Sequence, residues 1–125
     1  MKKALLVVAH GSRRETSNDE VRAITTKVRE SSQVFDLVEC GFLELAEPSI
    51  VQAGNQLINR GATDIVVLPY FLAAGRHVTR DIPDEVALID NQHPSTRIII
   101  APNIGAAAGM QQLVLEHLQQ INSSG

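Results

Sequence analysis

Residues 5–14, which read LLVVAHGSRR, decide the fold of this chain. Five aliphatic residues, two of them β-branched, run from Leu5 to Ala9 and end in His10, which is followed by a glycine, a serine and two arginines. An apolar run of this kind is typical of a central strand in a parallel sheet, which is covered on both faces. His10 then stands at the carboxyl end of the strand, the edge where open parallel sheets bind their ligands. We therefore expect His10 to be a functional residue.

Composition limits the possible partners and the compartment. The 125 residues suit one domain with a single core. The net charge is −3 and the basic residues are scattered, which argues against nucleic acid or an anionic membrane as a partner. Cys40 is the only cysteine, which excludes an internal disulfide, and we expect it to be a small buried apolar residue. The sequence shows neither a leader peptide nor a long apolar span, so we expect a cytoplasmic protein.

Strands and helices alternate along the chain. Strands are predicted to start near residues 4, 34, 64 and 97, and these starts lie 30, 30 and 33 residues apart, the length of a βαβ unit. The predicted helices begin with a capping box at residues 17–20, with the pair Glu47-Pro48, with Pro83 and near Met110. The second of them ends at Gly61, the last runs to Ile121, and residues 122–125 are expected to be frayed.

This rhythm predicts an α/β fold. Right-handed crossovers between parallel strands place helices on both faces of the sheet, giving three layers, α/β/α. We expect a four-stranded parallel sheet in the order 2-1-3-4, as in flavodoxin-like folds, with residues 1–125 forming a single domain.

The topology brings three residues to one edge of the sheet. His10 follows the first strand, Glu44 the second, and His77 lies in the loop after the third, at separations of 34 and 33 residues. Two imidazoles and a carboxylate at one crevice can hold a borderline divalent metal ion or accept protons near neutral pH. These three residues are therefore the candidate catalytic and metal-binding set.

Plainer interpretations exist for each of these residues. A single loop histidine is more often a surface or hydrogen-bonding residue than a ligand, and we interpret His93 and His117 in that way. Glu44 alone is also typical of a solvated loop carboxylate or a helix cap. The spacing of the three candidates is not a compact signature such as HExxH.

Three segments carry a family resemblance. Residues 9–14 (AHGSRR), 41–50 (GFLELAEPSI) and 68–83 (LPYFLAAGRHVTRDIP) resemble the class II sirohydrochlorin chelatases, which include the cobaltochelatases of cobalamin biosynthesis and the ferrochelatases of siroheme synthesis. At 125 residues the chain is similar to the short form, half the size of the two-domain members. Residues 105–109 (GAAAG) depart from the relatives, which often carry a histidine there.

The resemblance implies a reaction and roles for residues. The enzyme would insert a divalent metal, Co²⁺ first and Fe²⁺ or Ni²⁺ as alternatives, into sirohydrochlorin, with no permanently bound cofactor. His10, His77 and Glu44 would act at the metal and in removing the two pyrrole protons. Sirohydrochlorin carries many carboxylates, so we expect Arg13 and Arg76, with the Ser12 hydroxyl, to bind it. Tyr70 and Phe71 are expected to form an apolar floor for the macrocycle or part of the core.

A half-length chain also predicts a homodimer, in which a second copy takes the place of the missing half and covers the apolar side of the last helix. Two other functional classes remain. One is a non-catalytic metallochaperone or tetrapyrrole carrier that uses the same residues. The other is a phosphoryl-transfer or nucleotide-binding domain, although the chain contains neither a GxxxxGK[ST] nor a GxGxxG motif.

Overall fold

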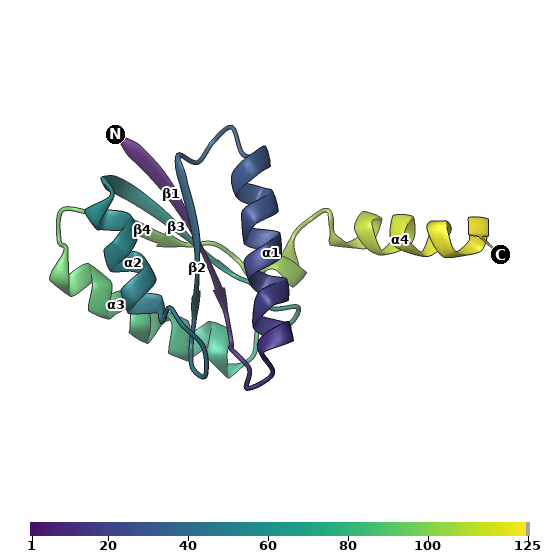
Figure 1. Ribbon diagram of the computed structural model, residues 1–125, viewed down its shortest axis with the longest axis horizontal. Helices are drawn as coiled ribbons and strands as arrows, with labels where there is room; N and C mark the ends of the chain where they lie inside the picture. Colours follow the sequence, from purple (N-terminus) through teal and green to yellow (C-terminus); the bar gives the residue numbers. More distant parts are fainter. Residues whose placement is uncertain (125) are drawn as a thin grey trace.

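A computed structural model describes residues 1–124, and its centre is a four-stranded parallel sheet in the order β2-β1-β3-β4 (Figure 1). The elements are, in chain order, β1 (Lys2–Ala9), α1 (Glu15–Ser31), β2 (Leu37–Phe42), α2 (Ile50–Asn59), β3 (Ala62–Pro69), η1 (His77–Asp81), α3 (Ile82–Gln92), β4 (Arg97–Ile100), η2 (Ile104–Ala106) and α4 (Met110–Ser124). The predicted fold class and strand order are confirmed.

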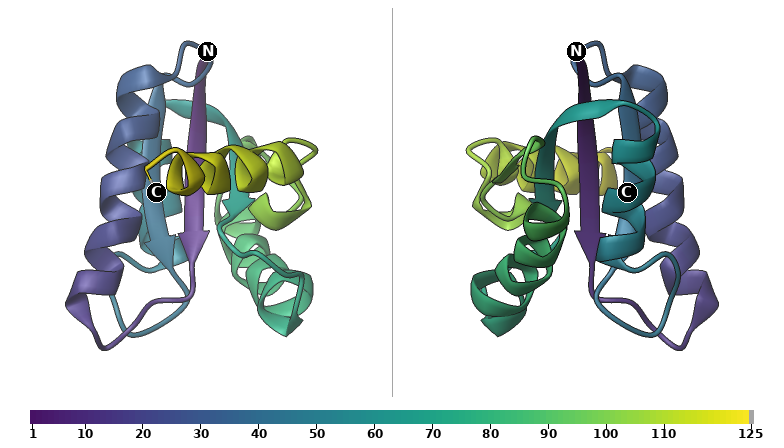
Figure 2. Two further views of the ribbon diagram at one scale, coloured as in Figure 1. Left: turned by 90° about the vertical axis from the view of Figure 1, so that its right-hand side faces the viewer. Right: turned by 90° about the vertical axis from the view of Figure 1, so that its left-hand side faces the viewer.

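The central strand β1 supplies both halves of the core. Its side chains alternate, so Ala4, Leu6 and Val8 pack beneath α2 and α3, while Leu5 and Val7 face α1 on the opposite side of the sheet. Figure 2 shows α1 on one face of the sheet, and α2 and α3 on the other. Cys40 is buried in the cluster on the α1 side, as the sequence predicted.

Two helix starts differ from the prediction. The predicted capping box at residues 17–20 is wrong, because α1 begins at Glu15 and these residues lie inside the helix. Asn18 is buried there and holds the preceding loop: its Oδ1 accepts from the Ser12 amide at 2.9 Å and its Nδ2 donates to the Ser12 carbonyl at 2.8 Å. The capping box of the chain belongs instead to α2, where Ser49 and Gln52 exchange hydrogen bonds just after Pro48.

The connection after β3 also differs. The strand ends at Pro69, so Tyr70 and Phe71 lie in the following loop. The sequence predicted His77 in a loop. Instead it begins the π-helical turn η1, which runs directly into α3. Pro83 therefore stands in a helix that is already under way, in the first turn of α3.

Helix α4 has the predicted position in the chain but projects away from the sheet (Figure 1). Its main contact with the rest of the protein is with η2. Within residues 1–124, no helix is both long enough and apolar enough to cross a membrane. The predicted cytoplasmic location stays a prediction. Residues 122–124, which we expected to be frayed, belong to α4, and residue 125 lies outside the described part of the chain.

Candidate active site

The loops after β1 and β2 lie against each other and form one wall of the site. The amide of Leu43 donates to the Ala9 carbonyl, and that of Glu44 donates to the His10 carbonyl, each at 3.0 Å. Gly11 makes this approach possible, because a Cβ at that position would lie 1.7 Å from the Glu44 carbonyl oxygen. Its φ of +94° is in addition one that side-chain-bearing residues rarely adopt. The backbone therefore holds His10 and Glu44 side by side.

The His10 ring lies between two oxygen acceptors. Its Nδ1 is 2.8 Å from the carbonyl oxygen of Gly11, and its Nε2 is 3.1 Å from Oε1 of Glu44. A proton on Nδ1 satisfies the Gly11 carbonyl, and one proton shared between Nε2 and Oε1 satisfies the other pair. When Nε2 carries no proton, a cation between Nε2 and Glu44 satisfies the same two groups. This pair can therefore exchange a proton for a metal ion.

His77 is oriented from the next turn of its own helix. Its Nδ1 lies 2.7 Å from Oδ2 of Asp81, four residues on, so Nδ1 carries the proton and Nε2 keeps its lone pair. The His77 and His10 ring centroids are 4.6 Å apart at an interplanar angle of 64°. On another side the His77 ring stacks on Phe71, at a centroid distance of 6.4 Å. The two histidines predicted from topology thus meet at one edge.

These side chains border an open cavity of about 230 Å³. Besides the predicted residues, it is lined by Leu43, Asp81, Asp84 and Glu85. The side chains of His10, Glu44 and His77 are 38%, 58% and 49% exposed, so the donor atoms are reached from solvent. Four carboxylates beside two imidazoles give the cavity a character that attracts cations.

The site lacks a preformed metal cage. In the part of the chain that the structure describes, no group of three or more His, Cys, Asp or Glu side chains is arranged to hold a metal ion. His10, Glu44 and His77 are close, but their donor atoms do not converge on one point. Nitrogen and oxygen donors of this kind suit Co²⁺, Fe²⁺ or Ni²⁺, and they bind less tightly than a set of thiolates.

Comparisons with known proteins show the family of this chain. A family model described as CbiX matches residues 4–121. The chain belongs to the CbiX family. The sirohydrochlorin cobaltochelatase of Methanocaldococcus jannaschii is 44% identical over 90 residues, which make up 72% of this chain and 62% of that protein. The resemblance to sirohydrochlorin chelatases, predicted from three motifs, is confirmed.

Two solved structures show how this CbiX chain relates to longer and shorter proteins. The sirohydrochlorin chelatase SirB from Bacillus subtilis subspecies spizizenii, in complex with cobalt, superposes with a TM-score of 0.86 at 33% identity, covering 97% of this chain and 51% of that one. The putative cobalamin biosynthesis CbiX protein from Marinobacter aquaeolei superposes with a TM-score of 0.84 at 25% identity. The match covers 98% of this chain and 99% of that one. This CbiX chain therefore spans about half of the Bacillus chain and nearly all of the Marinobacter one.

None of the predicted substrate-binding residues lines the cavity of this CbiX domain. Arg13 and Arg76 are exposed on the loops that precede α1 and η1, and within residues 1–124 neither guanidinium makes an ion pair. Ser12 turns its Oγ toward the Arg14 amide, which donates to it at 3.0 Å. Phe71 contacts His77, whereas Tyr70 lines a separate apolar groove on the α1 side.

Sequence reasoning missed the carboxylates on the far wall of the cavity. Asp81, Asp84 and Glu85 come from η1 and the first turn of α3. The signal was the spacing of four residues between His77 and Asp81, which puts two side chains on one face of a helix. A loop at His77, which the sequence pattern predicts, would not place the two side chains on one face.

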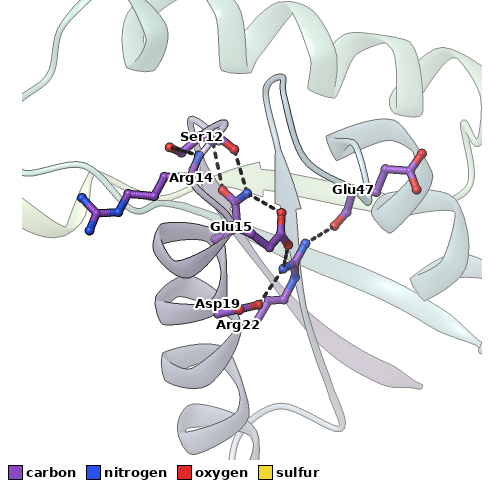
Figure 3. A network of polar contacts seen from close by, with 7 residues as sticks. Ser12, Arg14, Glu15, Asp19, Arg22 and Glu47 are labelled. Carbon is purple, nitrogen blue, oxygen red and sulfur yellow. Dashed lines mark hydrogen bonds and ion pairs between the residues drawn. The ribbon is translucent and has the colours of Figure 1, made fainter.

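A polar network braces the wall that carries His10 and Glu44 (Figure 3). Arg22 of α1 binds Glu15 and Asp19 and donates to the Glu47 carbonyl at 2.9 Å, so it ties the start of α1 to the loop after β2. The hydrogen bond from Arg22 lowers the pKa of the Glu15 carboxyl, which favours its charged form. None of these contacts reaches the cavity. We therefore infer that the network stabilises the wall and takes no direct part in a reaction there.

Proposed function

We propose that this chain inserts a divalent metal ion, Co²⁺ in the first place and Fe²⁺ or Ni²⁺ as alternatives, into sirohydrochlorin. The observation that carries the proposal is the meeting of His10, Glu44 and His77 at one open edge of the sheet, with the two imidazole rings 4.6 Å apart. Membership of the CbiX family and the similarity to named sirohydrochlorin chelatases support it.

The reaction exchanges two protons for one metal ion. The metal must lose water, and the two pyrrole N–H groups of the macrocycle must lose their protons as the ion enters. In our proposal the ion is held at Nε2 of His10, Nε2 of His77 and the Glu44 carboxylate, and the same groups accept protons once the ion has moved on. Nδ1 has an oxygen partner in both histidines, so Nε2 is the ring atom left for the metal or a proton. The hydrogen bonds do not divide the ligand and base roles among the three residues.

Binding of the macrocycle needs more surface than one chain offers. A cavity of about 230 Å³ lies below the usual range for pockets that enclose drug-sized ligands, roughly 300–1,000 Å³, and a tetrapyrrole is larger than most of these. The macrocycle therefore has to lie across the rim, with its carboxylates toward the exposed guanidiniums of Arg13 and Arg76 and the Ser12 hydroxyl. We propose that the chain is a single half-size chelatase domain and that a second copy covers the other side of the substrate in a homodimer.

The test is the initial rate of metal insertion, followed by the absorption change of sirohydrochlorin, with Co²⁺, Fe²⁺ and Ni²⁺ in turn. We expect His10→Ala and His77→Ala each to lower the rate by about 100-fold, at the low end of what a positioned acid–base group contributes. His93→Gln is the matched control, because His93 lies outside the cavity and bonds Asn55.

Two results would contradict the proposal. If both alanine variants retain the wild-type rate, the site is wrong. If the wild-type protein does not exceed the spontaneous rate yet binds metal or sirohydrochlorin, the chain is a carrier that uses the same residues for binding alone.

A further inference from the structure

Leu45 combines two properties that are unusual for a leucine. Its φ of +66° lies in the left-handed region, and within residues 1–124 it is the one residue other than glycine with a positive φ. The residue is in addition 51% exposed. Residues with a side chain avoid this conformation because Cβ crowds the following carbonyl oxygen, and glycine or asparagine adopts it at lower cost. The stability of the fold therefore does not explain a leucine at this position.

The loop that carries Leu45 is held from both ends. It leaves β2 and returns at once, since the Phe42 amide donates to the Pro48 carbonyl at 2.9 Å. On one side of Leu45, the Glu44 amide donates to the His10 carbonyl at 3.0 Å. On the other side, the next residue packs against the core cluster on the α1 side of the sheet. These contacts maintain a backbone that is unfavourable for leucine, and conformations of this kind are concentrated at functional sites.

The same loop forms a wall of the candidate site. Leu43 and Glu44 line the cavity, whereas Leu45 is not among the lining residues and is open to solvent. Successive Cα atoms are about 3.8 Å apart, so Leu45 lies beside the cavity, one residue from a candidate metal ligand. A tetrapyrrole that takes an ion from Glu44 is much wider than this separation. Leu45 is therefore within reach of the macrocycle.

Exposure alone would not distinguish Leu45, because single aliphatic residues are common on protein surfaces and need no special role. Val34 is an example. It is 62% exposed in the loop before β2, at the end of the sheet opposite to the site, and its φ is not positive. At Leu45, by contrast, an exposed apolar side chain, a costly backbone conformation and a position beside the cavity occur together.

We propose that Leu45 contacts a face of the tetrapyrrole and helps to place the macrocycle over the metal-binding residues. This inference rests on the proposed function and adds a substrate-binding residue to it. The carboxylates of sirohydrochlorin lie at the edge of the macrocycle, where the guanidiniums of Arg13 and Arg76 suit them. The faces of the ring system are apolar, and an exposed leucine supplies the contact that such a face needs. Arginines at the edge and a leucine at the face together recognise a flat, carboxylate-bearing ring.

The experiment separates the side chain of Leu45 from its backbone. Leu45→Asn and Leu45→Gly remove the apolar side chain and suit the left-handed conformation, whereas Leu45→Met keeps an apolar side chain of similar size. Val34→Asn is the matched control, the same kind of change at an exposed loop position far from the cavity. Binding of metal-free sirohydrochlorin is measured by its fluorescence anisotropy, binding of Co²⁺ by calorimetry, and the Tm by circular dichroism.

Covering a whole leucine strengthens binding by roughly 10- to 150-fold, so covering the exposed half corresponds to about 4- to 12-fold. We expect Leu45→Asn and Leu45→Gly to raise the dissociation constant for sirohydrochlorin by that factor, at low and high salt alike. Arg13→Ala should weaken binding less at high salt, because salt screens charges. Leu45→Met and Val34→Asn should stay near the wild-type value. For all Leu45 variants, we expect unchanged Co²⁺ affinity and a Tm no more than about 3 °C below the wild type.

Three results would overturn the contact. The first is sirohydrochlorin binding as tight in Leu45→Asn and Leu45→Gly as in Val34→Asn. The second is a lower Tm together with weaker Co²⁺ binding, which would mean that Leu45 only supports the wall. The third is a loss in Leu45→Met as large as that in Leu45→Asn, because the apolar surface would then not be what matters. None of these readouts depends on metal insertion. A protein that binds sirohydrochlorin through Leu45 but does not exceed the spontaneous insertion rate contradicts the proposed function alone.

Discussion

Asp81 offers a direct test of how the site is built, because it touches His77 and was not predicted from the sequence. Its Oδ2 accepts the Nδ1 proton of His77 at 2.7 Å, which fixes the tautomer and leaves Nε2 free toward the cavity. Carboxylates that orient a ligating histidine are worth about 10–100-fold in metal affinity or activity. Both side chains are partly exposed, at 49% and 38%, so water screens the charge and the loss for Asp81→Asn belongs at the low end.

We therefore expect Asp81→Asn, which keeps an oxygen acceptor and loses the charge, to slow Co²⁺ insertion about tenfold, equivalent to about 1.4 kcal/mol of transition-state stabilisation. Asp81→Ala also loses the acceptor and should approach 100-fold. The control is Asp90→Asn, the same change at an exposed position of α3.

A purely structural role for Asp81 would not change the tautomer of His77, so the second measurement is the ¹⁵N NMR spectrum of the histidine rings. The wild type should show neutral His77 protonated at Nδ1, and Asp81→Ala should show a mixture of tautomers. If Asp81→Ala inserts metal as fast as Asp90→Asn, or if the tautomer is unchanged, Asp81 does not position His77 and our description of the site is wrong.

One further prediction concerns the wall that holds His10 and Glu44, and another concerns the buried thiol of Cys40. Gly11→Ala should lower the Tm by about 4–10 °C and slow metal insertion, because the new Cβ meets the Glu44 carbonyl and the left-handed conformation costs roughly 1–3 kcal/mol. Gly75→Ala, whose Cβ meets nothing within 4 Å, is the control, and equal melting temperatures for the two variants would contradict this account. Burial raises the pKa of the Cys40 thiol, so less thiolate is present at pH 8 and the native protein should react with a disulfide reagent more slowly than the unfolded chain. Equal rates would show that Cys40 is accessible.

The sheet and the meeting of His10, Glu44 and His77 were predictable because they depend on topology alone. The apolar run of β1 identifies a central strand, the regular spacing of strand starts identifies parallel βαβ units, and parallel strands release their following residues at one edge. These inferences need only hydrophobic pattern and chain order. That is why they survive errors of several residues in the element boundaries.

The features that escaped prediction depend on contacts between distant segments. The predicted start of α1 is too late in the chain. Asn18 forms hydrogen bonds with the Ser12 backbone from inside the helix, an arrangement that no local capping rule describes. The π-helical turn begins at His77, whose ring contacts those of His10 and Phe71. Before α4 begins, the chain passes at Gly105 against the Leu72 carbonyl, a contact that no local pattern predicts. An amphipathic pattern predicts that α4 is a helix that must be covered, but not which surface covers it.

The open site suits a metal ion that binds transiently and is passed on, rather than one that stays bound to the protein. A structural zinc site surrounds its ion with four protein ligands, and release from it is slow. Here the three donors remain exposed and unconverged, and one of them, Nε2 of His10, already faces the carboxylate that can hold its proton. In the proposed reaction, an ion at this edge would lose only part of its water and would keep coordination positions open to a macrocycle lying across the rim. In the proposed reaction, His10 and Glu44 would again share a proton once the ion has left for the macrocycle. Weak binding of the ion at this edge prevents a permanent metal centre, and it also allows the ion to be transferred to the macrocycle in the proposed reaction.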